Sequence, residues 1–162
     1  MGNLIDTTEY EDPAGNALTQ SGYRLVRMGD LDPLTKPKLF VDYMLGAFAD
    51  CASEESLSLI SRNPKHRPIS RTLLRSGPMA AAMTLPRDLF KIALLADAYA
   101  IAVVRGEPSE DVAMTKHDHR VVKRFGETAG WLGIEFVDYL VVSTRDNLRR
   151  PTFYSWSAAG RL

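Results

Sequence analysis

The chain has 162 residues, of which 45% are hydrophobic and 25% charged, a composition typical of one globular domain with a substantial core. Lys plus Arg and Asp plus Glu balance at 20 each, so no overall basic field points to nucleic acid or an anionic membrane. The single cysteine, Cys51, excludes an intramolecular disulfide and a zinc site built from several cysteines. No apolar segment approaches the roughly 20 residues of a spanning helix, and the polar N-terminus is not a secretory signal, so we expect a cytoplasmic protein with no membrane contact.

The N-terminal part of the chain is polar and shows no sustained hydrophobic period. Residues 1–32 are therefore predicted to form a flexible arm ahead of a domain that spans residues 33–162, and the run 23–28 could add an edge strand. A helix is predicted from Lys38 onward, because apolar residues recur there at three- and four-residue spacing. Its buried face is expected to contain Leu39, Phe40, Tyr43, Met44 and Phe48.

Two strands and a second helix follow. Leu and Ser alternate from 56 to 59, which is typical of a half-buried strand, and 69–74 reads as a second strand that completes a hairpin. A helix begins at Pro86, because proline suits the first turn and Asp88 favours its positive end. Its buried stripe is expected to contain Leu89, Phe90, Ala93, Leu94 and Ala96.

The second half of the chain continues this alternation. Residues 98–104 form an unbroken apolar run, the mark of a strand covered on both faces. A helix is predicted from Thr115 to Gly133, and strands are predicted over 134–142 and 152–156. The inner face of this helix is expected to contain Val121, Val122, Phe125, Thr128, Ala129 and Leu132. Strands interleaved with helices predict an α/β (α+β) fold, a mixed β-sheet flanked by helices.

The segment from 105 to 118 carries the most specific signal. It reads Arg-Gly-Glu-Pro-Ser-Glu-Asp-Val-Ala-Met-Thr-Lys-His-Asp. This resembles His-x-His-Pro, six residues, Ser, two residues, Asp, which is the metal-site (JAMM) motif of the JAB/MPN family, and most closely its bacterial RadC-like branch. Pro108 and Asp118 are in register, and Thr115 stands where the Ser would be. Arg105 and Glu107 occupy the two His positions.

The resemblance extends over more than half of the chain. Residues 55–65 resemble the family's Glu-bearing strand and turn, and 86–91 resembles its Pro-Arg-Glu-Val-Phe-Lys helix. Residues 132–134 and Asp138 resemble its Leu-Gly-Ile and Asp-His pair, with Tyr139 in place of that His. The resemblance implies a sheet-and-helix architecture related to the cytidine deaminases. Full-length RadC proteins also carry a helical DNA-binding-like segment ahead of this domain, which we expect to be largely absent here.

In active members of the family, the resemblance implies, two His and an Asp hold zinc. A Glu on the first strand takes the proton of the zinc-bound water, and the Ser helps to hold the transition-state oxygen. Carried over to this chain, the base position matches Glu55, the oxyanion-helper position matches Thr115, and the remaining ligand matches Asp118.

The two substituted positions put zinc binding in doubt. The Arg105 guanidinium stays protonated and has no lone pair for a metal, whereas Glu107 could ligate. Arg105 could instead replace zinc and bind Asp118, Glu107 or Glu55, because buried carboxylates without a metal need a cationic partner.

A new His-x-His, formed by His117 and His119, lies beside the motif. On a helix, residues two apart point about 200° away from each other, so the two side chains could act together as rescue ligands only from an extended loop.

Three functions remain open. We expect a non-catalytic binding or scaffold module, a pseudoenzyme with an unknown protein partner and no cofactor. The alternative is a divergent zinc metallopeptidase or isopeptidase of JAMM type that uses Asp118, Glu107 and a relocated histidine. A DNA-repair-associated role is suggested by the RadC resemblance alone, and nucleic acid is not the expected partner.

Overall fold

The computed structural model describes residues 24–27, 31–48, 52–145 and 150–161. Its elements, in chain order, are β1 (Arg24–Arg27), α1 (Pro37–Phe48), β2 (Ser56–Arg62), β3 (Pro68–Ser76), α2 (Ala80–Met83), α3 (Pro86–Leu95), β4 (Ala100–Glu107), α4 (Lys116–Leu132), β5 (Glu135–Ser143) and β6 (Phe153–Ser155). Cys51 lies outside the described residues.

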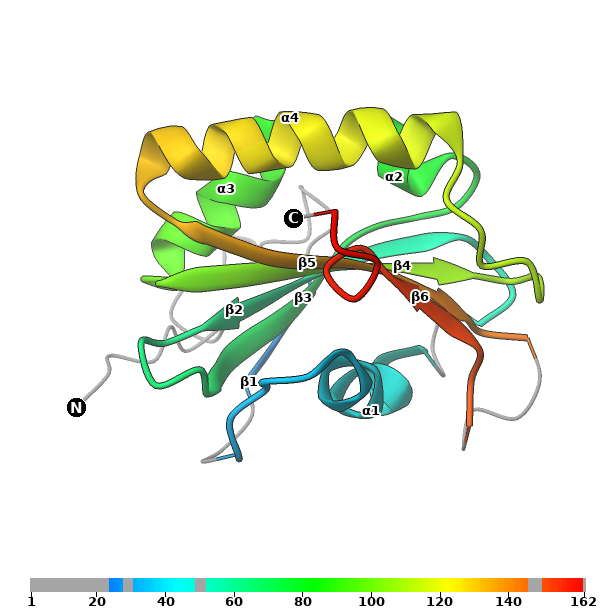
Figure 1. Cartoon of the computed structure of the whole chain (residues 1–162), viewed down its shortest axis with the longest axis horizontal. Helices are drawn as coiled ribbons and strands as arrows, with labels where there is room; N and C mark the ends of the chain where they lie inside the picture. The colour runs from blue at the N-terminus through cyan, green and yellow to red at the C-terminus, as the bar shows by residue number, and fades with distance from the viewer. Residues whose placement is uncertain (1–23, 28–30, 49–51, 146–149, 162) are drawn as a thin grey trace, which may run out of the picture.

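Within these residues, six strands form one sheet in the order β1-β3-β2-β4-β5-β6. The pair β4–β5 is parallel and the other neighbours are antiparallel. A parallel pair needs a crossover between its strands, and α4 is that crossover. Figure 1 shows α1 on one face of the sheet and α2, α3 and α4 on the other. The predicted mixed sheet flanked by helices is confirmed.

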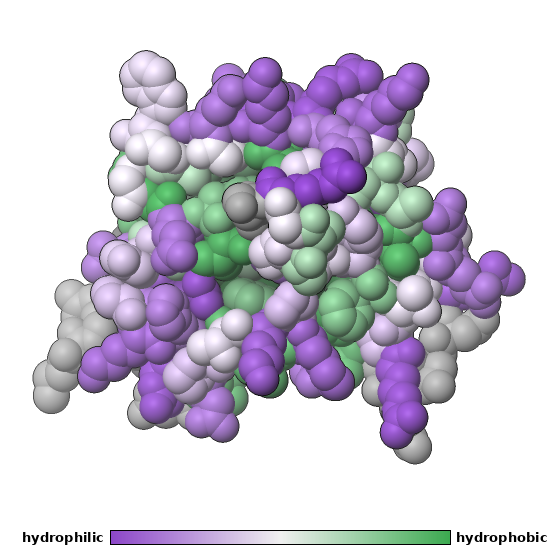
Figure 2. All heavy atoms as spheres, in the orientation of Figure 1, coloured by the Kyte–Doolittle hydropathy of each residue, from purple (hydrophilic) through white to green (hydrophobic). Residues whose placement is uncertain are grey.

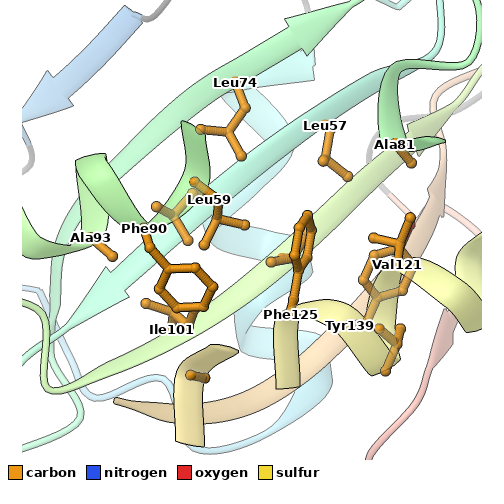
Figure 3. Packing of buried hydrophobic residues seen from close by; sticks show 14 of the residues in the cluster. Leu57, Leu59, Leu74, Ala81, Phe90, Ala93, Ile101, Val121, Phe125 and Tyr139 are labelled. Atoms are coloured by element: carbon orange, nitrogen blue, oxygen red, sulfur yellow. The ribbon is translucent and has the colours of Figure 1, made fainter. Parts of the chain in front are cut away.

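The sheet separates two apolar cores. Because neighbouring side chains of a strand point to opposite faces, Ile101 and Val103 of β4 face α3 and α4, whereas Ala102 and Val104 face α1. β4 is thus covered on both faces, as its unbroken apolar sequence predicted. Side chains of the core under α3 and α4 point toward one another in Figure 3, and they include Leu57, Leu59, Phe90, Ile101, Phe125 and Tyr139.

Helix α4 begins and ends where the sequence predicted. Gly133 closes it with φ 67°, a left-handed conformation that glycine adopts without steric cost. Figure 2 shows hydrophilic side chains along its outer side and hydrophobic atoms in the layer between this helix and the sheet. In the described part of the chain, no helix combines the length and the apolar character needed to cross a bilayer.

Three details of the prediction were wrong. β2 is buried along its whole length rather than half-buried, because β3 and β4 flank it and helices cover both faces. Leu39, Leu94 and Leu132 were expected to face the core, but they are 38%, 57% and 43% exposed. Leu39 precedes the buried Phe40 by one residue, and adjacent helical positions point about 100° apart. The short helix α2 was not predicted.

The predicted N-terminal arm falls largely on residues 1–23 and 28–30, which lie outside the described residues. The part of it that is described, β1, pairs antiparallel with β3 at the edge of the sheet. The sequence had allowed an edge strand at this position.

Candidate functional site

Arg105 lies near the end of β4, on the face of the sheet that α4 covers. It follows Ile101 and Val103 at two-residue spacing, so its side chain continues their row. Only 4% of the residue is exposed. A guanidinium at this depth needs partners, because removing a charge from water costs several kcal/mol unless it is paired.

The first turn of α4 supplies one partner. Thr115 is the N-cap residue: its Oγ1 accepts a hydrogen bond from Asp118 N at 3.1 Å, and its own N donates to Asp118 Oδ2 at 2.8 Å. These reciprocal bonds fix the Asp118 carboxylate at the start of the helix. Its Oδ1 lies 3.0 Å from Nε of Arg105, and Asp118 is only 1% exposed. Helix capping and charge pairing thus use the same carboxylate.

A tyrosine from the neighbouring strand β5 completes the environment of Asp118. The hydroxyl of Tyr139 donates to Asp118 Oδ1 at 2.6 Å, and that of Thr115 donates to Asp118 Oδ2 at 2.7 Å. Both carboxylate oxygens are therefore already engaged by the protein.

Glu107 is the second carboxylate beside Arg105. Nη1 of Arg105 donates to Glu107 Oε2 at 2.5 Å, and Glu107 Oε1 accepts from Ser109 N at 3.2 Å. The hypothesis that Arg105 binds the carboxylates of the motif is confirmed for Asp118 and Glu107. Glu55, the third carboxylate that Arg105 could have bound, has another partner: its Oε1 accepts a hydrogen bond from Ala81 N in α2 at 3.1 Å.

Arg105 keeps unused hydrogen-bonding capacity. Its Nε is close to Asp118, but the N–H is not aligned for a hydrogen bond, so that contact is an ion pair. Among the described residues, Nη2 has no hydrogen-bond partner. We refer to Arg105, Glu107, Asp118 and Tyr139 as the arginine cluster.

The charges of this cluster keep both Arg105 and Tyr139 protonated. Burial alone lowers the pKa of Arg105, but the negative charges of Asp118 and Glu107 raise it, and the net shift is upward. Burial raises the pKa of Tyr139 well above its usual value, and the charge and hydrogen bond of Asp118 raise it further. The cluster therefore holds a permanent guanidinium cation and a neutral phenol.

This donor set does not fit a zinc ion. Arg105 offers no lone pair, and the oxygens of Asp118 are already occupied by Tyr139 and Thr115. Structural and catalytic zinc sites use at least three Cys, His, Asp or Glu ligands. In the part of the chain that the structure describes, no three such side chains are arranged to hold a metal.

The structure does not bring the two nearby histidines together. His117 and His119 both lie in the first turns of α4, where residues two apart point in different directions. Both are exposed, and the ring of His119 instead meets that of Trp156 edge-on, with centroids 5.1 Å apart.

Sequence reasoning missed the role of Tyr139. It was noted only as a replacement for a family histidine, although it binds the retained Asp118 directly. The sequence did hold a signal for this role. With Arg105 and Glu107 at the two histidine positions, Asp118 has no metal and needs hydrogen-bond donors, and the Tyr139 hydroxyl is such a donor.

Comparisons with known proteins bear on the family of the chain. The family model described as RadC-like JAB domain matches residues 34–158. A UPF0758 protein of Chlorobium chlorochromatii (strain CaD3) is 29% identical over 121 residues, which cover 75% of this chain and 51% of that protein. One of Staphylococcus carnosus (strain TM300) is 31% identical over 116 residues, covering 70% and 51%. The chain spans about half the length of the curated relatives it matches, and their name states no activity.

Proposed function

This chain belongs to the RadC-like JAB domain family, and from that premise we propose that it is a metal-free, non-catalytic binding or scaffold module. The observation that carries the proposal is the 3.0 Å ion pair between Arg105 Nε and Asp118 Oδ1 at the position of the family's metal motif. The cation that these carboxylates need is supplied by the chain itself.

Electrostatics supports the loss of metal binding. A guanidinium held between Asp118 and Glu107 would repel a divalent ion placed at the same carboxylates, by several kcal/mol at an effective dielectric of about 20. Arg105 is buried and paired on two sides, so moving it away would leave both carboxylates without their cation. Arg105 and zinc therefore compete for one place.

The positions that match the catalytic roles also have structural partners. Glu55, at the base position, accepts the backbone N–H of Ala81. The Thr115 hydroxyl, at the oxyanion-helper position, donates to Asp118 as part of the helix cap. The single hydroxyl proton of Thr115 is thus donated to Asp118 rather than to a substrate oxygen.

A binding role is supported by the surface beside the arginine cluster. Helix α2, which Glu55 contacts, follows Met79 and ends at Met83, and these two residues are 52% and 54% exposed. Exposed methionines are frequent on protein-binding surfaces, because their flexible, polarizable side chains adapt to different partners. The expected partner is a protein.

Metal analysis tests the proposal. Protein purified without chelator is expected to contain far less than one zinc per chain by plasma mass spectrometry, and Asp118→Asn is expected to leave that content unchanged. Asp111→Asn, in the exposed loop before α4, is the matched control. Near-stoichiometric zinc that disappears in Asp118→Asn but stays in Asp111→Asn would instead establish the zinc-peptidase alternative.

A further inference from the structure

A cavity of about 250 Å³ lies on the face of the sheet opposite the arginine cluster. It opens beside the first turn of α1, and its lining includes Thr35, Phe40, Arg62, Glu135 and Asp138. Phe40 belongs to the core under α1, whereas Tyr139 of the arginine cluster belongs to the core under α4. The cavity is therefore separate from the site described above.

Strand register places a cation and a carboxylate on opposite sides of a small residue. Arg62 of β2 pairs with Ala100 of β4, and Ala100 pairs with Glu135 of β5. Strands are about 4.8 Å apart, so Arg62 and Glu135 lie roughly 10 Å apart at Cα. Both line the cavity.

Arg62 is buried without a counter-ion. It is 4% exposed, its Nη1 donates to the carbonyl of Leu34, and its guanidinium lies 5.3 Å from the centre of the Phe40 ring. Among the described residues it forms no ion pair, and its Nε has no hydrogen-bond partner. Burial lowers the pKa of Arg62, and the more distant charge of Glu135 only partly opposes this. Arg105, equally buried, has two carboxylates.

The buried carboxylate in the lining does not serve Arg62. Asp138 Oδ1 accepts from Tyr139 N at 2.8 Å and from Ser157 N at 2.9 Å. Its Oδ2 accepts from Ser155 Oγ at 2.6 Å. These bonds hold Asp138 to the turn after β6, so the unpaired buried charge in the cavity lining is that of Arg62.

We propose that this cavity binds a small zwitterion of amino-acid size, with its carboxylate on Arg62 and its ammonium group toward Glu135. The carboxylate supplies the counter-charge that the buried guanidinium lacks. Phe40 forms an apolar wall for the ligand's hydrocarbon part. The volume lies just below the range of about 300–1,000 Å³ typical of drug-sized ligands, which favours a compact molecule.

Titration of the full chain with L-alanine, followed by 15N chemical shifts, tests the proposal. L-alanine is expected to give saturable shifts around the cavity, propionate weaker ones and propylamine none. Arg62→Met is expected to lower the affinity for L-alanine about ten- to a hundredfold, the factor for one charge-assisted hydrogen bond. Glu135→Gln is expected to reduce L-alanine binding to the level of propionate.

Two further variants distinguish ligand binding in the cavity from nonspecific binding to charged groups on the surface. Thr35→Trp places an indole ring at a residue that lines the cavity and should abolish the shifts, whereas Lys36→Trp at the next, exposed residue should keep them. Ligand-free Arg62→Met should melt at the same or a higher temperature than the parent, because it removes an unpaired buried charge. No saturable shift with L-alanine or propionate, shifts that persist in Thr35→Trp, or a strongly destabilised Arg62→Met would each overturn the proposal.

Discussion

Tyr139 and Asp118 are joined by a hydrogen bond of 2.6 Å across 21 residues of sequence. The same carboxylate oxygen lies 3.0 Å from Nε of Arg105. One buried carboxylate thus connects β4, the first turn of α4 and β5, which are the three elements of the parallel crossover. Disturbing any of these partners should affect the packing of α4 on the sheet.

Removing the cation should destabilise the domain strongly. Arg105→Met leaves the buried Asp118 without its counter-ion, a change that typically costs about 3–5 kcal/mol of unfolding free energy. The double variant Arg105→Met/Asp118→Asn should recover part of that loss, because it removes the unpaired charge. Urea unfolding measures both. Lys123→Met, which removes an exposed cation 4.0 Å from Glu127, should change the stability little. Equal effects of Arg105→Met and Lys123→Met would contradict a structural role for the buried pair.

Restoring the family's histidines should restore metal binding. In Arg105→His/Glu107→His, two neutral imidazoles and Asp118 provide three ligands at the spacing of the family motif. Dialysis against zinc followed by metal analysis should show close to one zinc per chain in this variant and little in the parent. Adding Asp118→Asn should remove it. A folded double variant that binds no more zinc than the parent would show that Arg105 and Glu107 are not what prevents metal binding.

Alkaline pH should destabilise the domain through two buried tyrosines. Burial raises the pKa of Tyr43 to about 12, and burial together with Asp118 raises that of Tyr139 well above 10. Unfolded tyrosine ionises near pH 10, so this contribution is complete below about pH 10 and is lost as the pH rises through the folded pKa values. The unfolding free energy should fall by about 1.4 kcal/mol per pH unit for each tyrosine.

The matching Phe variants isolate this effect. Tyr43→Phe/Tyr139→Phe should flatten the profile above pH 10, while Tyr139→Phe alone should also lower the stability at neutral pH, since Asp118 loses a donor. Tyr99→Phe, at an exposed position, should leave the profile unchanged. If the unfolding free energy of the double variant fell as steeply above pH 10 as that of the parent, the alkaline destabilisation would come from other groups.

The glycine between the two substituted motif positions should not tolerate a side chain. A Cβ on Gly106 would lie against Ser56 Oγ, 3.2 Å from Thr144 Cγ2 and 3.3 Å from Phe48 Cε1. Gly106→Ala should therefore cost about 1–3 kcal/mol through overpacking. Gly130→Ala, on α4 with nothing within 4 Å, should stabilise by up to about 1 kcal/mol. Thermal melts should show shifts of opposite sign, and two shifts of the same sign would contradict this packing.

The sequence predicted the fold well because its signals were local and repeated. Thr115 and Gly133 mark the ends of α4, and Pro86 marks the start of α3. The burial of β2 was not predictable in this way: its serines alternate with leucines as if one face were wet, and only the helices on both faces bury them.

The candidate site was predicted in part. The motif register together with the charge of Arg105 indicated that this residue would bind carboxylates of the motif. In the structure it binds Asp118 and Glu107 rather than Glu55. That choice depends on α2, which binds Glu55 and which no periodicity indicated. The cavity at Arg62 was also beyond the sequence, because it is formed by register between strands that are distant along the chain.

The pair formed by Arg105 and Asp118 has a consequence for how the domain would be maintained in a cell. A metal ion dissociates, competes with other ions and must be delivered after synthesis. A guanidinium on β4 has a fixed, very high effective concentration at its carboxylates from the moment the strand and helix pack. A domain built in this way would need no metal delivery after synthesis, and its stability would not depend on the concentration of free metal in the cell.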